Sequence, residues 1–141
     1  MDGIAVLVDS RTGNTKKIAT AIADELGVGL GDISAPAPAD TRLLFLGSGT
    51  YSNSAPGGDV MRFIRNGSFP GFRVALFGTS SYETDGQKMI GMMADALESK
   101  GAAIVSVNGS RGRLFVLRNG RTHQDDLDGA RAFARGMTTG G

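Results

Sequence analysis

Short apolar runs alternate along the chain with segments in which apolar residues recur every three or four positions. Runs of strand length lie at residues 4–8, 43–46, 74–77 and 103–107. Helical periodicity marks segments over 15–26, around 60–64, over 86–100 and over 124–136. In the first helical segment, for example, Ile18, Ile22 and Leu26 form one apolar stripe. The pattern therefore predicts strands separated by amphipathic helices.

Two segments have weaker strand patterns, and the C-terminal end has none. Residues 28–39 are rich in glycine and proline, so any strand there is a weak edge strand. The apolar run at 114–117 is either a strand continuation or a minor hairpin. We expect one domain over residues 1–137 and a frayed tail over 138–141, since 141 residues supply a single core.

Strands that are apolar throughout and are separated by helices indicate a parallel sheet covered by helices on both faces. We therefore predict the α/β class, with a single doubly wound domain and a five-stranded parallel sheet in the order 2-1-3-4-5. Ligands of such sheets bind beyond the carboxyl ends of the strands, at the switch point. The loops that follow residues 8, 46 and 77 are thus the candidate binding loops.

The first loop, residues 10–15, reads Ser10-Arg11-Thr12-Gly13-Asn14-Thr15 and leads directly into a predicted helix. Hydroxyls and backbone N–H groups at a helix N-terminus attract anions, although a helix cap with polar decoration has the same composition. The dense packing of hydroxyls and glycine after a buried strand favours a monophosphate site. The spacing of a nucleotide P-loop is missing. Arg11 either contacts the phosphate or points to water.

The second loop, residues 47–53, and the third loop, residues 78–86, each contain one of the only two tyrosines, Tyr51 and Tyr82. Each ring follows a strand end, where it is available to stack on a planar ligand or to close over its own loop. Two such rings beside a phosphate loop predict a site for a phosphorylated aromatic cofactor. Asp9 also ends a strand, but the acidic pair and lysine of a response regulator are missing.

The three loops together resemble those of flavodoxins. The first loop is similar to their S/T-x-T-G-x-T phosphate loop, Ser80-Ser81-Tyr82-Glu83 resembles the flavin-stacking loop of short-chain members, and Gly49-Thr50-Tyr51 resembles the segment that carries their other aromatic residue. Asp125-Asp126-Leu127 is similar to the start of their last helix. The resemblance covers nearly the whole chain and implies a flavodoxin-like fold with FMN as cofactor.

By this resemblance, Ser10, Thr12, Asn14 and Thr15 hold the FMN phosphate, Tyr82 stacks on the outer face of the flavin and Tyr51 covers the inner face. Main-chain groups of 48–53 and 79–82 contact the polar edge of the ring. The full set of expected cofactor-binding residues is Ser10, Arg11, Thr12, Gly13, Asn14, Thr15, Ser48, Gly49, Thr50, Tyr51, Ser52, Asn53, Thr79, Ser80, Ser81 and Tyr82.

The composition excludes several kinds of site and distinguishes this chain from typical flavodoxins by its charge. The chain has no cysteine and one histidine, which excludes disulfides, thiolate metal sites and a cysteine nucleophile, and no metal site is expected. Its 15 basic and 14 acidic residues give a net charge of +1, whereas the resembled family is strongly acidic. Fewer carboxylates near the ring make the fully reduced, anionic flavin easier to form, because there is less Coulomb repulsion. Ser52 stands where flavodoxins often have glycine, which makes a positive φ costlier there.

The resemblance implies a low-potential FMN protein that shuttles electrons between a reductase and an acceptor. Two alternatives stay open: a small flavin- or quinone-type NAD(P)H reductase on the same fold, and an accessory flavoprotein that activates a specific metalloenzyme. An arginine-rich stretch is either a solvated face or a docking patch for an anionic partner; its members are Arg111, Arg113, Arg118 and Arg121. We expect a cytoplasmic monomer that binds neither nucleic acid nor membranes, since no apolar run reaches the length of a membrane span and no signal peptide is recognisable.

Overall fold

The structure is a computed structural model that describes residues 3–11, 13–107, 110–111, 113–117 and 124–139. Three parallel strands form its centre: β1 (Ile4–Asp9), β2 (Leu43–Gly49) and β3 (Arg73–Ser80). In their register Asp9 lies opposite Ser48, and Ser48 lies opposite Gly78. The carboxyl ends of all three strands therefore meet at one edge of the sheet, and the loops that follow them open on the same side.

Beyond β3, the sheet continues with two short strands rather than with one. β4 (Ala103–Ile104) pairs in parallel with the start of β3, and β7 (Arg113–Leu117) pairs in parallel with its second half. Between them, β5 (Ser106–Val107) and β6 (Ser110–Arg111) form a separate antiparallel pair. The expected single strand over 103–107 is therefore wrong beyond Ile104, because the chain leaves the sheet there. The run at 114–117 is a strand of the main sheet.

The opposite edge also differs from the expectation. Among the described residues of 28–39, only Leu30 pairs with β1, through an isolated parallel bridge to Val6. The sheet thus reads β1-β2-β3-β4, with β7 also beside β3, and the edge strand of the expected order 2-1-3-4-5 is reduced to that bridge. Glycine and proline in this segment cannot sustain a longer ladder. The parallel α/β architecture itself is confirmed.

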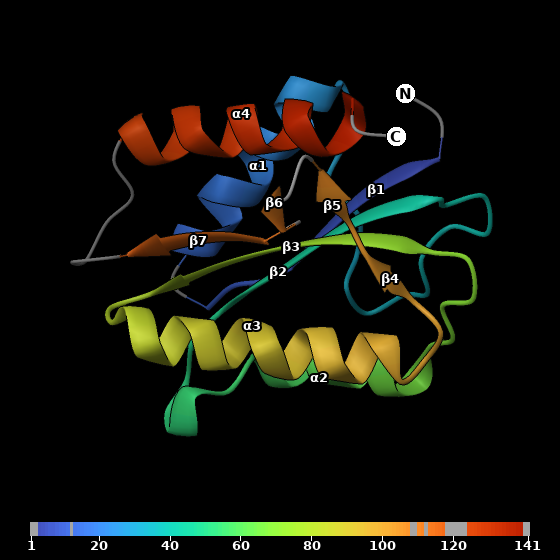
Figure 1. The fold of residues 1–141 in the computed structure, drawn as a ribbon, viewed down its shortest axis with the longest axis horizontal. Coiled ribbons are helices and arrows are strands. Elements are labelled where there is room, and N and C mark those ends of the chain that lie inside the picture. The colour runs from blue at the N-terminus through green and yellow to red at the C-terminus, as the bar shows by residue number, and fades with distance from the viewer. Residues whose placement is uncertain (1–2, 12, 108–109, 112, 118–123, 140–141) are drawn as a thin grey trace.

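Helices cover both faces of the sheet (Figure 1). On one face lie α1 (Asn14–Leu26) and α4 (Gln124–Thr139), and on the other α2 (Gly58–Asn66) and α3 (Glu83–Glu98). Successive residues of each strand point to opposite faces of the sheet. Val6, Phe45 and Phe77 pack toward α1 and α4. The residues that adjoin them in the chain, Leu7, Leu46 and Leu76, pack toward α2 and α3. The helix α4 ends at Thr139, beyond the expected end at 136.

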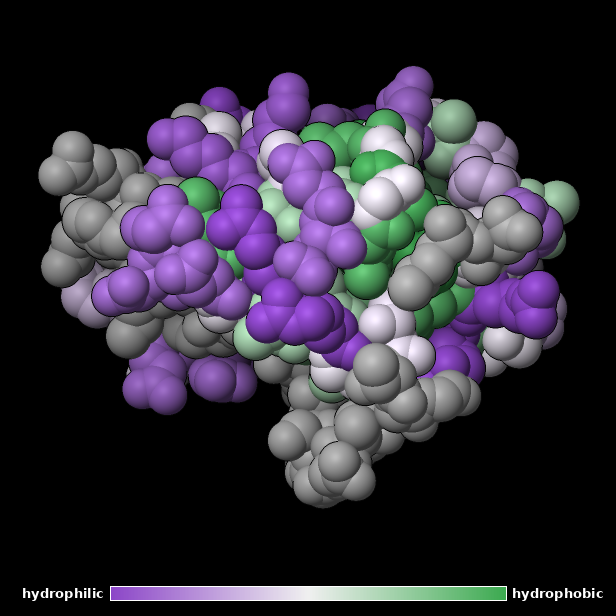
Figure 2. Space-filling model, turned by 90° about the horizontal axis from the view of Figure 1, so that it is seen from above, coloured by the Kyte–Doolittle hydropathy of each residue, from purple (hydrophilic) through white to green (hydrophobic). Residues whose placement is uncertain are grey.

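The surface over α1 and α4 is mainly polar, with a smaller apolar area in its middle (Figure 2). No helix in the described ranges combines the length and the apolar character needed to cross a membrane. Of the arginine-rich stretch, Arg111 and Arg113 lie on β6 and β7, and Arg118 and Arg121 lie outside the described residues. The expected docking patch consequently stays a prediction.

Candidate functional site

The first loop places an uncapped helix end at the carboxyl edge of the sheet. Gly13 precedes α1 with a φ of 90°, a left-handed conformation that glycine adopts at little cost. The Gly13 N–H donates to Ser10 Oγ over 3.1 Å, and Gly13, the N-cap residue, supplies no side chain to cap α1. The positive end of the helix dipole therefore faces the loop, as an anion site requires. Thr12 lies outside the described residues.

Hydrogen bonds join the three loops in every pairwise combination. Thr15 Oγ1 in α1 lies 2.8 Å from Thr79 Oγ1 at the end of β3, with both side chains buried. Thr50 Oγ1 donates to the Thr79 carbonyl over 2.9 Å, which ties the second loop to the third. The Arg11 N–H donates to Tyr51 Oη over 3.1 Å, which ties the first loop to the second. The structure thus assembles the three predicted loops into one unit.

Tyr51 folds over the first loop rather than into solvent. Its ring lies beneath the Arg11 guanidinium, whose Cζ is 4.2 Å from the ring centroid. A Cβ added at Gly49 would lie 2.9 Å from Tyr51 Oη and 3.1 Å from Cζ. Any larger residue at position 49 would therefore push the hydroxyl end of this ring aside.

Tyr82 has the opposite environment. It is 70% exposed and immediately precedes α3, at the same edge of the sheet as the first loop. Its N–H donates to Ser80 Oγ over 3.3 Å, while Ser81 is exposed. A large aromatic side chain held this far out of the core has a free face for a planar ligand.

Two left-handed residues end the second loop: Asn53, its last residue, has a φ of 62°, and Ser54, directly after it, has a φ of 57°. Ser52, which stands where flavodoxins often have glycine, is not one of them. Asparagine tolerates this region better than most residues. Ser54 Oγ donates to Asp85 Oδ1 over 2.8 Å, a second link to the third loop that sequence reasoning missed.

Two polar side chains at the strand ends form hydrogen bonds with backbone groups of the protein. Ser48, an expected cofactor-binding residue, is fully buried; its Oγ donates to the Gly49 carbonyl (2.7 Å) and accepts from the Gly57 N–H (2.9 Å). Asp9 is also buried and accepts a hydrogen bond from the Val60 N–H in the first turn of α2 over 3.0 Å. Asp9 is therefore the carboxylate at the N-terminus of α2, a role with no local sequence signal.

A cleft of about 740 Å³ opens beside the first loop, toward residues 30–33 and the start of α2. Its charged lining is mixed: Arg11, Lys16, Arg62, Asp9, Asp32 and Asp59. Arg62 pairs with Asp59 at 3.1 Å. Hydrogen bonds from the hydroxyl and the backbone N–H of Ser34 lower the pKa of Asp32, so this carboxylate is ionised at neutral pH.

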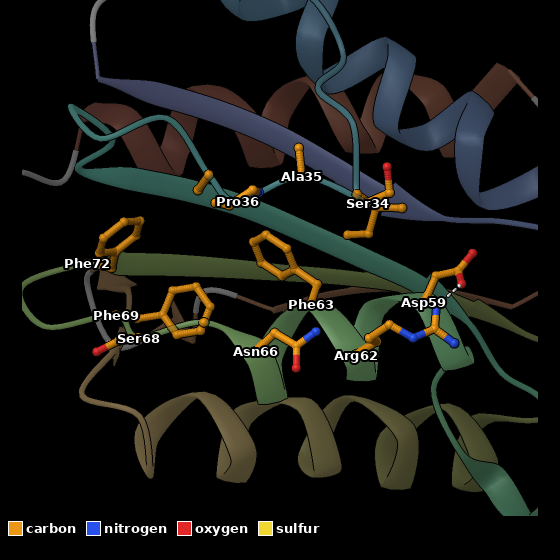
Figure 3. Close-up of a pocket in the computed structure, with 13 residues that line it drawn as sticks. Ser34, Ala35, Pro36, Asp59, Arg62, Phe63, Asn66, Ser68, Phe69 and Phe72 are labelled. Atoms are coloured by element: carbon orange, nitrogen blue, oxygen red, sulfur yellow. Dashed lines mark hydrogen bonds and ion pairs between the residues drawn. The ribbon is translucent and has the colours of Figure 1, made fainter.

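A second cavity, of about 400 Å³, continues from this cleft along α2, since both are lined by Asp59 and Arg62 (Figure 3). Its walls are mainly apolar, with Phe63, Phe69 and Phe72 on one side and residues 33–37 on the other. Within the described ranges, no group of three or more carboxylate or histidine side chains is placed to hold a metal ion.

Comparisons with known proteins identify the family. The flavodoxin family model matches residues 6–133. No curated protein matches the chain. Among solved structures, oxidised flavodoxin 2 from Bacillus cereus has a TM-score of 0.77 at 21% identity, covering 96% of this chain and 97% of that one. A WrbA-like flavodoxin from Agrobacterium tumefaciens has a TM-score of 0.73 at 18% identity, with coverages of 98% and 97%.

A flavodoxin from Fusobacterium nucleatum, solved with flavin mononucleotide bound, has a TM-score of 0.71 at 16% identity and coverages of 99% and 98%. At these identities the structural matches show the shared fold, and the family model shows the membership. The resemblance found in the three loops is thereby confirmed: this chain belongs to the flavodoxin family.

Proposed function

We propose that this protein binds FMN across the three loops and carries electrons between partner proteins. The observation that carries the proposal is that hydrogen bonds join the N-terminal loop of α1, the loop with Tyr51 and the loop with Tyr82 into one unit at the sheet edge. Family membership supports flavin-based electron transfer in general, and FMN is the flavin bound to the Fusobacterium nucleatum relative. The Val6–Leu30 bridge supports the full sheet order 2-1-3-4-5, with the segment around Leu30 as its edge.

The residues present fit the two chemically distinct ends of FMN. A phosphate matches the first loop, where Ser10, Asn14 and the N-terminus of α1 supply hydroxyl, amide and backbone donors around Gly13. The two tyrosines suit the two faces of an isoalloxazine ring. Tyr51, half-buried against the loops, suits the inner face, and the exposed Tyr82 suits the outer face. When bound, FMN supplies reversible one- and two-electron transfer; the chain binds it, orients it and limits the access of water.

The exposed position of Tyr82 favours a carrier. A ring stacked there lies at the protein surface, where another protein can approach it closely enough to exchange electrons. Which partners do so stays a prediction, as does docking through the arginine-rich stretch.

A small NAD(P)H reductase is the second candidate, favoured by the 740 Å³ cleft beside the first loop, which is large enough for a substrate. The two functions differ in one assay. Oxidation of NAD(P)H without an added reductase indicates the enzyme, whereas reduction only through a partner reductase indicates the carrier.

The visible spectrum of the purified protein tests the cofactor. We expect flavin absorption bands, release of FMN on denaturation, and recovery of the bands when FMN is added back at a 1:1 ratio. A colourless protein that does not bind FMN in a titration would overturn the proposal.

A further inference from the structure

Arg11 contacts the Tyr51 side chain in two ways. Its backbone N–H donates to Tyr51 Oη over 3.1 Å, and its guanidinium lies over the ring of the same tyrosine, with Cζ 4.2 Å from the centroid. Forty positions separate the two residues along the chain. One contact fixes the hydroxyl end of the ring, and the other covers one of its faces.

The neighbouring carboxylates do not account for this placement. Arg11 shares a cleft with three carboxylates, but each has another partner. Asp9 accepts from the N-terminus of α2, Asp32 accepts from the N–H and hydroxyl of Ser34, and Asp59 pairs with Arg62. Within the described part of the chain, the Arg11 guanidinium forms no ion pair. Its one specific contact is the aromatic face, which attracts a planar guanidinium through the quadrupole of the ring.

We propose that Arg11 is a positioning residue for Tyr51, and that it affects flavin binding through the tyrosine ring rather than through the phosphate. Because the guanidinium covers one face of the ring, a planar ligand can stack only on the opposite face. The layers are then Arg11, Tyr51 and the isoalloxazine. The part of this inference that concerns the flavin rests on the proposed function; the contact between Arg11 and Tyr51 does not.

This role predicts a particular dependence on the ligand. Riboflavin has the ring system of FMN but no phosphate. If Arg11 acts through Tyr51, Arg11→Gln weakens the binding of FMN and riboflavin by the same factor, roughly two- to fivefold for a partly exposed cation–π contact. If Arg11 instead binds the phosphate, the substitution weakens FMN binding and leaves riboflavin binding unchanged.

Flavin fluorescence titrations of the apoprotein measure both dissociation constants. The matched control is Arg62→Gln, since Arg62 lines the same cleft but pairs with Asp59; we expect it to change neither constant. In a Tyr51→Leu background, Arg11→Gln should lose its effect on both ligands. A selective loss of FMN binding, or an undiminished effect of Arg11→Gln without Tyr51, would overturn the inference.

A measurement without cofactor separates this inference from the proposed function. The chain has two tyrosines and no tryptophan, so Tyr82→Phe leaves Tyr51 as the only strongly fluorescent residue. Removing the covering guanidinium should increase the quenching of Tyr51 by acrylamide in Arg11→Gln but not in Arg62→Gln. Unchanged quenching refutes the positioning role even if FMN binds. If the wild type binds neither flavin, the proposed function fails while the quenching result still decides this inference.

Discussion

Thr15→Val removes one hydroxyl from a buried pair while nearly preserving the volume of the side chain. Thr15 and Thr79 are 2% and 5% exposed, and their Oγ1 atoms lie 2.8 Å apart. The loss of the hydrogen bond and the unpaired Thr79 hydroxyl that remains together predict a fall of about 1–3 kcal/mol in the free energy of unfolding. At about 1.4 kcal/mol per factor of ten, the equilibrium constant for unfolding rises roughly 5- to 140-fold.

Urea unfolding of the apoprotein, followed by circular dichroism, gives this free energy. Thr79→Val should cost a similar amount, and the double variant should cost less than the sum of the two, because it leaves neither hydroxyl unpaired. Thr20→Val is the matched control in the same helix: Thr20 is exposed and its Oγ1 donates to the Lys16 carbonyl, so we expect a change within about 0.5 kcal/mol. Additive single effects would show that the two hydroxyls are not coupled.

Three further predictions follow from other contacts. Gly49→Ala places a Cβ 2.9 Å from Tyr51 Oη and should displace the ring, which a flavin titration detects as weaker binding; unchanged affinity would contradict the packing. Asp9→Ala removes the carboxylate from the N-terminus of α2 and should cost about 1–2 kcal/mol in urea unfolding, whereas Asp9→Asn keeps an acceptor and should cost less. The net charge of +1 predicts a less negative potential for the second one-electron reduction of the flavin than in acidic flavodoxins, which a redox titration measures.

The layered fold could be predicted because its signals are local. Ile18 and Ile22 recur at helical spacing and are fully buried in α1, and the runs at 43–46 and 74–77 lie within β2 and β3. The interruption after Ile104 also has a local signal in the sequence. Asn108-Gly109 separates two strand-forming stretches, and this dipeptide is the strongest short-range indication of a hairpin.

The contacts of the candidate site had no such signal. The sequence indicated which loops lie together, because the carboxyl ends of neighbouring parallel strands share an edge. It did not indicate that Arg11 lies over Tyr51, that Ser48 points inward, or that Asp9 meets the N-terminus of α2. Each of these contacts joins residues that become neighbours only after β1, β2 and α2 have packed.

Because the contacts of the site form only in the folded protein, the stability of the fold and the binding of a ligand are linked. Thr79 is hydrogen-bonded to both other loops: its hydroxyl pairs with the Thr15 hydroxyl, and its carbonyl accepts from Thr50 Oγ1. The site therefore exists only when β3 is paired with β2. A ligand of this site therefore binds the folded state alone, and at 100 times its dissociation constant it adds about 2.7 kcal/mol of stability. This gain is as large as the expected cost of Thr15→Val. Saturating FMN should consequently restore much of the stability that the variant loses in the apoprotein, provided that its affinity is retained.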